Sequence, residues 1–133
     1  MSILVEEVKK AVSKSAVTGS IVTKYYYSRA PQTTSYPYCV FYILLDTYSG
    51  NDTGTKYSNV VLQFNTFDNK NDYGKRCNDT LEQIMTYYDL AKDTLTVSGY
   101  TIINAYRDFI IPPREVETVW QGTVQYTLHI KNW

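Results

Sequence analysis

One histidine and two cysteines carry most of the nucleophilic and metal-binding potential of this sequence. His129 could act as a general base for Cys39 or Cys77, as in a Cys/His arrangement. Nothing around either cysteine resembles a nucleophile elbow or a thiolate-stabilising helix start. Structural zinc needs about four ligands at short spacings, whereas these three residues are scattered along the chain. We therefore expect two buried, reduced thiols rather than a disulfide, an exposed His129 on a strand, and no catalytic, metal or cofactor site.

Phosphate-binding and carboxylate chemistry have equally little support in the sequence. It contains neither a GxxxxGK[ST] loop nor a GxGxxG turn. Possible carboxylate pairs fall in predicted loops, beside Ser, Asn and Gly, where acidic residues serve turns and helix caps; they are Asp46, Asp52, Asp68 and Asp72. We expect these residues to be structural, and the protein not to be an enzyme.

Charge and aromatic content point to surface contacts. The 133 residues include 13 basic and 13 acidic side chains, a net charge of zero that disfavours binding to nucleic acid by phosphate neutralisation. The count of 14 tyrosines is unusually high for this chain length. Tyrosine is enriched at protein interfaces, although an AT-rich genome would also raise its frequency. The triplet Tyr25–Tyr27 lies near Lys24 and Arg29, but neighbouring strand residues face opposite sides, so base stacking there has weak support.

The N-terminal residues do not form a signal peptide, because acidic residues interrupt the apolar run. The longest apolar stretch, 38–45, is far too short to cross a bilayer. We expect a soluble protein made in the cytoplasm.

Hydrophobic periodicity predicts a single domain over residues 1–133 with two helices and several strands. In chain order we expect a helix at 2–16, a strand at 21–28, a loop at 29–36, a strand at 38–45 covered on both faces, a polar loop or hairpin tip at 46–56, a strand at 57–67, a helix at about 70–91, one or two strands over 94–111 ended by Pro112 and Pro113, and a final strand at 120–130. Short connections favour an α+β fold, with a mainly antiparallel sheet of about four to six strands and two helices packed on it.

Three strings in this order resemble the tail terminator (tail-completion) proteins of long-tailed bacteriophages. They are Ser35–Tyr42 after a helix and a first strand, Val60–Phe67 leading into an amphipathic helix, and Tyr126–Ile130 in the last strand. The resemblance implies a virion protein assembled in the host cytoplasm. It implies a ring, typically a hexamer, that caps the tail tube and joins it to the head connector while DNA passes through the lumen. The family offers no catalytic residue to transfer.

Candidate contact residues come from the polar loop at 46–56, the segment 111–118 and tyrosines outside the expected core. They are Tyr25, Tyr27, Tyr48, Tyr57, Asn51, Asp52, Pro112, Pro113 and Arg114. The core is expected to hold Tyr38, Tyr42, Tyr73, Tyr88 and Tyr126. Two alternatives remain open, namely another head–tail neck or adaptor component and a small phage-encoded binding module such as a host-factor inhibitor.

Overall fold

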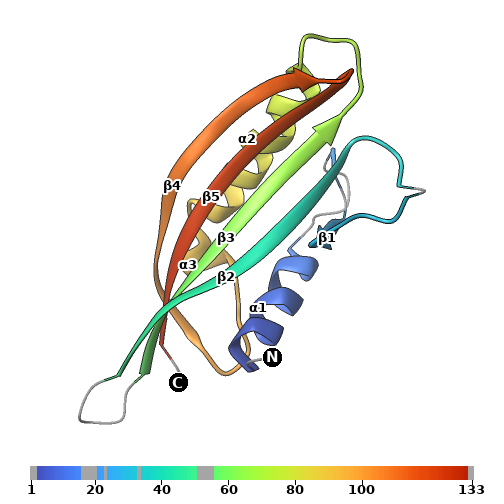
Figure 1. Cartoon of the computed structure of the whole chain (residues 1–133). Coiled ribbons are helices and arrows are strands. Elements are labelled where there is room, and N and C mark those ends of the chain that lie inside the picture. Colours follow the sequence, from blue (N-terminus) through green and yellow to red (C-terminus); the bar gives the residue numbers. More distant parts are fainter. Residues whose placement is uncertain (1–2, 16–20, 23, 33, 51–55, 132–133) are drawn as a thin grey trace.

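A five-stranded sheet forms one layer of the molecule and three helices form the other (Figure 1). The computed structural model describes residues 3–15, 21–22, 24–32, 34–50 and 56–131. The elements are α1 Ile3–Lys14, β1 Tyr25–Tyr27, β2 Tyr38–Gly50, β3 Lys56–Asp68, α2 Lys75–Tyr88, α3 Ala91–Thr94, β4 Thr101–Val116 and β5 Val119–Lys131. The predicted α+β fold is confirmed.

The strand order is β1-β2-β3-β5-β4. The short β1 is parallel to β2, and the other three pairings are antiparallel. The outer strands are therefore β1 on one side and β4 on the other, with the long hairpin strands between them. This order places two chemically different edges at opposite ends of the sheet.

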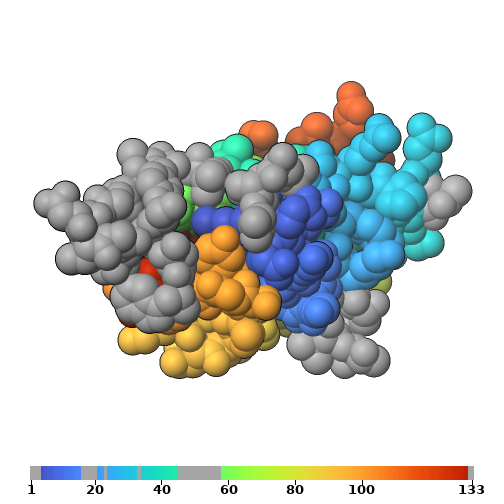
Figure 2. Space-filling view, turned by 90° about the horizontal axis from the view of Figure 1, so that it is seen from below, coloured from blue at the N-terminus to red at the C-terminus, as the bar shows by residue number. Residues whose placement is uncertain are grey.

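The helices cover a single face of the sheet (Figure 1). Alternate residues of β2, β3 and β5 point toward them and are buried, as the period of two in a strand requires. These side chains form one cluster with the apolar stripes of α1 and α2; its large members include Val8, Phe41, Leu62, Phe64, Leu81, Ile84, Tyr88, Tyr126 and Leu128. Figure 2 shows α1 beside the segment around α3 at one end of this layer. Each fully buried large side chain contributes about 1.5–3 kcal/mol.

The helix α2 lies close to the backbone of β5 at Gly122. A Cβ atom there would lie 2.6 Å from Leu81 Cδ1 on α2. Only glycine fits this crossing without displacing a buried leucine. Gly122 is buried under α2, and its lack of a side chain is what lets α2 pack closely.

The second helix begins at Lys75, later than the predicted 70. Gly74 precedes it with φ 79°, and the Asp72 carboxylate accepts a hydrogen bond from the Arg76 backbone amide at 3.0 Å. Tyr73 lies in the preceding turn and is 92% exposed. The prediction that Tyr73 belongs to the core was therefore wrong, because the helical spacing that suggested it does not extend to residue 73. Tyr88 and Tyr126 are fully buried, as predicted.

The region between α2 and β5 also differs from the prediction. Residues 91–94 form the short helix α3, and the described strand starts at Thr101, so the expected strand at 94–97 is absent from this described stretch. β4 does not end at Pro112. It continues to Val116, with a register shift between Ile111 and Arg114. Proline is tolerated there because β4 is an edge strand and the irregularity removes the need for an amide donor.

Candidate assembly surface

No helix among the residues that the structure describes lies on the opposite face of the sheet, which we call the helix-free face (Figure 1). Its side chains come from the alternate residues of β2, β3, β5 and β4. The register places them in four rows across the sheet: Tyr38, Phe67, Gln121 and Arg114; Val40, Asn65, Thr123 and Ile111; Tyr42, Gln63, Gln125 and Phe109; Leu44, Val61, Thr127 and Tyr106. Each row runs from β2 at one side to β4 at the other.

The middle of two of these rows holds only uncharged amides and hydroxyls, namely Asn65 with Thr123 and Gln63 with Gln125. Asn65 Oδ1 accepts hydrogen bonds from Gln63 Nε2 at 3.2 Å and from Thr123 Oγ1 at 2.9 Å. Asp108 sits at a bulge of β4, and its Oδ2 accepts from Gln125 Nε2 at 3.0 Å and from Thr127 Oγ1 at 2.6 Å. The polar groups in the centre of the helix-free face thus bind one another.

Apolar side chains line the β4 side of this face and continue around the edge. Tyr106 is 56% exposed, Phe109 41% and Ile111 45%. Ile110 on the other side of the strand and Val116 near its end are also exposed. We call Tyr106, Phe109, Ile110, Ile111 and Val116 the β4 flank. Large exposed side chains gathered in this way mark interaction sites on soluble proteins.

β4 is protected against indiscriminate pairing with other strands. Its ladder with β5 shifts register at three places, between Ile102 and Asn104, between Arg107 and Phe109 and between Ile111 and Arg114. Pro112 and Pro113 also lack an amide proton. Bulges and prolines are the usual devices that keep an edge strand from aggregating. A partner that approached β4 would therefore meet its side chains, and not a continuous row of free backbone amides and carbonyls.

The β2 side of the face contains a hollow of about 370 Å³. Residues 28–32 and Thr34 of the loop after β1 form one wall, and the other wall is Tyr36, Tyr38, Val40, Tyr42 and Phe67. Ring contacts hold this aromatic wall together: Tyr38 stacks on Phe67 with centroids 5.0 Å apart, and Tyr36 lies 5.2 Å from Tyr38. We call this feature the β2 hollow.

The predicted double coverage of strand 38–45 was wrong. Cys39, Phe41 and Ile43 are buried under the helices, and Val40 is buried at the β2 hollow, but Tyr42 is 36% and Leu44 58% exposed. Tyr38 is half-buried on the helix-free face, so Tyr38 and Tyr42 lie outside the core where we expected them. The strand is apolar at every position although helices cover only one of its faces.

The predicted contact residues fall in three different settings. Tyr25 and Tyr27 are half-buried on the helix-covered side: Tyr25 lies 5.7 Å from the Phe64 ring and Tyr27 5.3 Å from the Phe41 ring. Burial raises the pKa of the Tyr25 hydroxyl well above its usual range, with a further contribution from Cys39. Their contact role stays a prediction, with little free ring surface to support it.

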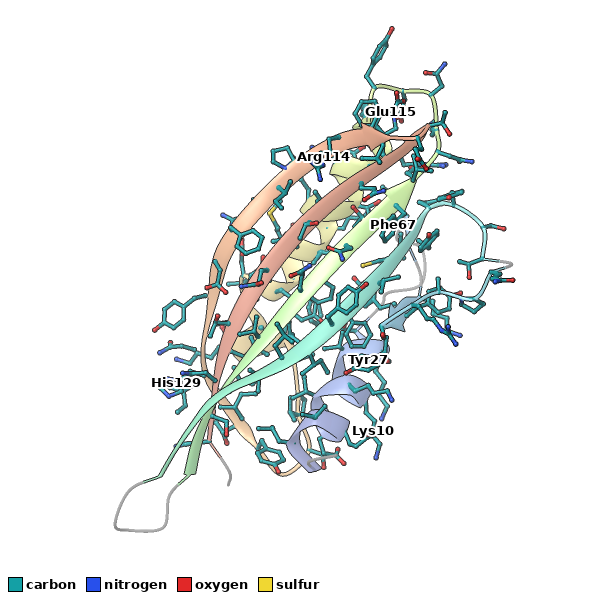
Figure 3. The ribbon with its side chains drawn as sticks, viewed as in Figure 1. Lys10, Tyr27, Phe67, Arg114, Glu115 and His129 are labelled. Atoms are coloured by element: carbon teal, nitrogen blue, oxygen red, sulfur yellow. The ribbon has the colours of Figure 1, made fainter. Side chains whose placement is uncertain are left out.

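The remaining predicted residues that the structure describes lie near the two ends of the long strands. Tyr48 and Tyr57 belong to the paired parts of β2 and β3. Asn51 and Asp52 lie outside the described residues. Pro112, Pro113 and Arg114 lie on the exposed edge of β4 beside the β4 flank, with Arg114 in the same row as Phe67 (Figure 3).

Sequence reasoning missed four exposed apolar residues of the helix-free face, namely Leu44, Tyr106, Phe109 and Ile111. Two signals in the sequence could have found them. The strand at 38–45 lacks polar residues on either face, and the run Phe109-Ile110-Ile111 places apolar side chains on both faces of another strand next to two prolines. A sheet with helices on one side cannot bury all of these.

The structure separates the residues that could have formed a Cys/His pair. Cys39 is fully buried on the helix-covered face, and Cys77 is buried beside Thr66 Oγ1 at 3.2 Å. His129 lies on the helix-free face, opposite Asn59 on β3 (Figure 3). Burial raises the pKa of both thiols, and the proximity of the two cysteines adds to the effect at Cys39. Within the described ranges, no group of three His, Cys, Asp or Glu side chains could hold a metal ion.

Both cysteines are free, as predicted, and we expect the folded protein to resist thiol reagents. Because burial raises the pKa of each thiol and blocks access, Ellman's reagent should release no rapid colour from the native protein and two equivalents after unfolding in guanidinium chloride. A rapidly reacting thiol in the native state would contradict this packing. Fewer than two equivalents after unfolding without reductant would contradict free cysteines.

None of the helices in the described part of the chain is long and apolar enough to cross a membrane. Comparison of the sequence with protein-family models and with curated proteins finds no match. Among solved structures, a chain of the "Virion of native gene transfer agent (GTA) particle" aligns with a TM-score of 0.56 at 10% identity, over 97% of this chain and 92% of that one. A second solved structure, of a chain without a descriptive name, gives a TM-score of 0.55 at 12% identity over 96% of each chain. The chain thus has the fold of these two proteins along almost its whole length.

Proposed function

We propose that this chain is a structural virion protein of a tailed phage or phage-like particle. In this role it acts as a tail terminator, a ring that caps the tail tube and joins it to the head connector. The sequence strings resemble that family, and the fold is shared with a chain of a gene transfer agent virion. The protein is assembled in the host cytoplasm and remains in the virion. Its partners are copies of itself, the tail tube protein and the connector protein.

The observation that carries this proposal is the group of exposed apolar side chains on the helix-free face of the sheet. Leu44, Tyr106, Phe109 and Ile111 are between 41% and 58% exposed there. A protein that stays monomeric has no use for so many exposed large apolar side chains on one layer. A subunit that is made as a soluble chain and later enclosed by neighbouring subunits would bury these side chains in its contacts. The zero net charge fits the same role, since it reduces repulsion between identical subunits.

A structural role without catalysis is part of the proposal. It is supported by the two buried thiols, whose raised pKa values disfavour the nucleophilic thiolate. It is also supported by the placement of His129 on the other face of the sheet. The DNA that passes through the ring would meet no basic run of this chain.

The experiment is native mass spectrometry and negative-stain electron microscopy of the purified protein, alone and with tail tubes from the same phage. We expect rings of one defined size, typically hexamers, and density at one end of each tube. A neck adaptor would instead bind the connector and leave the tubes uncapped. A binding module would remain monomeric at high concentration and leave the tubes unchanged. Either of these two results would reject the tail terminator assignment.

A further inference from the structure

The β4 flank and the β2 hollow lie at opposite edges of the sheet and at the same level along it. The row with Tyr42 on β2 ends at Phe109 on β4, and the row with Val40 ends at Ile111. The β2 hollow contains both Tyr42 and Val40. If the β4 flank of one copy contacted the β2 hollow of the next copy, the two copies would be displaced perpendicular to the strands and not along them. Contacts without a shift along the assembly axis close into rings, whereas shifted contacts give open filaments.

The charges around the two features are opposite in sign. From Ile21 to Leu44, the segment that contains the β2 hollow, the chain has Lys24 and Arg29 and no acidic residue. From residue 106 to residue 118, the segment that contains the β4 flank, it has three acidic residues and two arginines. Arg29 lines the β2 hollow and is exposed. Complementary charges of this kind orient partners and disfavour pairing of like surfaces.

Shape and backbone geometry point to docking by side chains. The β2 hollow of about 370 Å³ falls within the range of sites that enclose small ligands, so it can receive apolar side chains from a neighbour. Pairing of whole strands is disfavoured at both edges. β1 has only three residues, and β4 is interrupted by three register shifts and two prolines.

We infer that the β4 flank of one copy docks into the β2 hollow of the next copy, in a head-to-tail contact centred on Phe109 and Ile111. The occupant of the β2 hollow is therefore a second copy of this chain. The inference rests on the proposed ring and assigns its subunit interface. Because the two patches differ, each copy uses both of them, and every subunit in the ring makes the same two contacts.

The test uses two variants that each damage one side of the contact. Phe109→Asp places a charge on the β4 flank, and Tyr42→Asp places one in the wall of the β2 hollow. Both positions are exposed, so each variant should fold with the wild-type circular dichroism spectrum. Loss of a central interface side chain commonly weakens association by roughly 30-fold or more. Native mass spectrometry should therefore find each variant monomeric at concentrations where the wild type forms rings.

Mixing the two variants gives the decisive readout. The Phe109→Asp chain keeps an intact β2 hollow, and the Tyr42→Asp chain keeps an intact β4 flank. An equimolar mixture should form one-to-one dimers and no rings. The matched control is Leu90→Asp, at a position after α2 that is 57% exposed and belongs to neither patch; it should form rings like the wild type. Ile111→Asp should lose ring formation in the same way as Phe109→Asp. This second variant shows that the effect is not peculiar to one position.

Rings from either single variant, or a mixture that stays monomeric although the wild type forms rings, would overturn the inference. A wild type that is monomeric at every concentration would overturn both the inference and the proposed function. Wild-type rings that depend on Phe109 and Tyr42 but never cap tail tubes would reject the tail terminator role alone. The two proposals can therefore fail separately.

Discussion

Phe64→Ala is expected to lower the free energy of unfolding by about 3–5 kcal/mol, the usual cost of removing a fully buried phenylalanine ring. Phe64 lies on β3 at the centre of the core and is completely buried. Its ring centroid is 4.6 Å from that of Tyr88 on α2, 5.7 Å from Tyr25 on β1 and 6.3 Å from Phe41 on β2. The substitution would leave a cavity between the sheet and the helices that these rigid rings could only partly fill.

Urea denaturation of the wild type and the variant at neutral pH, followed by circular dichroism, measures this difference. The matched control is Phe109→Ala on the exposed side of β4, which should change the unfolding free energy by no more than about 0.5 kcal/mol. It should nevertheless weaken ring formation. A loss below about 1 kcal/mol for Phe64→Ala would contradict a close-packed core at this position. The denaturation should be carried out below the concentration at which rings form, so that assembly does not add to stability.

Arg76→Gln is expected to cost about 2–3 kcal/mol, because it leaves a buried carboxylate without its cation. Asp68 at the end of β3 is almost fully buried. Arg76 on the first turn of α2 donates to it twice, from Nε to Oδ2 and from Nη2 to Oδ1, both at 2.6 Å. The Lys70 backbone amide donates to Oδ1 at 3.1 Å. This pair attaches the start of α2 to the sheet and supplies the acceptor that an arginine near a helix N-terminus needs.

The same pair predicts how stability depends on pH. Burial by itself would raise the pKa of the Asp68 carboxyl, but the hydrogen bonds and the charge of Arg76, with the amides of Lys70 and Asn69, lower it below its usual value. A carboxyl whose pKa is lower in the folded state stabilises the protein above its unfolded pKa of about 3.9. That stability is lost as the pH falls through the folded pKa. The difference between wild type and Arg76→Gln should therefore be largest near neutral pH and shrink below about pH 4.

Unfolding measured across this pH range tests the assignment. Lys75→Gln is the matched control, since Lys75 Nζ lies 3.0 Å from Asp79 Oδ2 in an exposed pair one helical turn apart. Exposed pairs of this kind contribute little to stability. A cost for Arg76→Gln as small as that of the control would show that the Asp68 pair does not stabilise the fold. The same conclusion would follow from a cost that is independent of pH.

The local pattern of the chain predicted the fold class well. The buried residues Val60, Leu62, Phe64, Val124 and Leu128 follow the two-residue alternation of the predicted strands, because such a period depends only on which face meets the core. Tyr88 and Tyr126 were placed correctly for the same kind of reason. The start of α2 was misplaced because it is set by Asp72 and by the pairing of Arg76 with Asp68. Neither contact can be predicted from the helical spacing of apolar residues.

The candidate surface was predicted only in part. Pro112, Pro113 and Arg114 were chosen from composition, and they lie beside the β4 flank. Phe109 and Ile111 were assigned to an ordinary strand, because nothing in a single sequence says whether a strand is internal or at an edge. The prolines were expected to end β4, yet the strand passes them at a bulge, since its outer side has no ladder to maintain. An edge strand can accommodate prolines that an internal strand cannot.

Composition and periodicity were sufficient for an α+β protein of zero net charge. They could not tell whether the all-apolar strand 38–45 is buried on both faces or exposed on one, because the two cases have the same sequence. The tertiary structure decided this by placing α1, α2 and α3 on a single face. It also decided that Tyr42 and Phe109, 67 residues apart in the chain, end the same row on opposite sides of the sheet. Strand order and register arise from long-range packing, so the surface that we assign to assembly exists only in the folded protein.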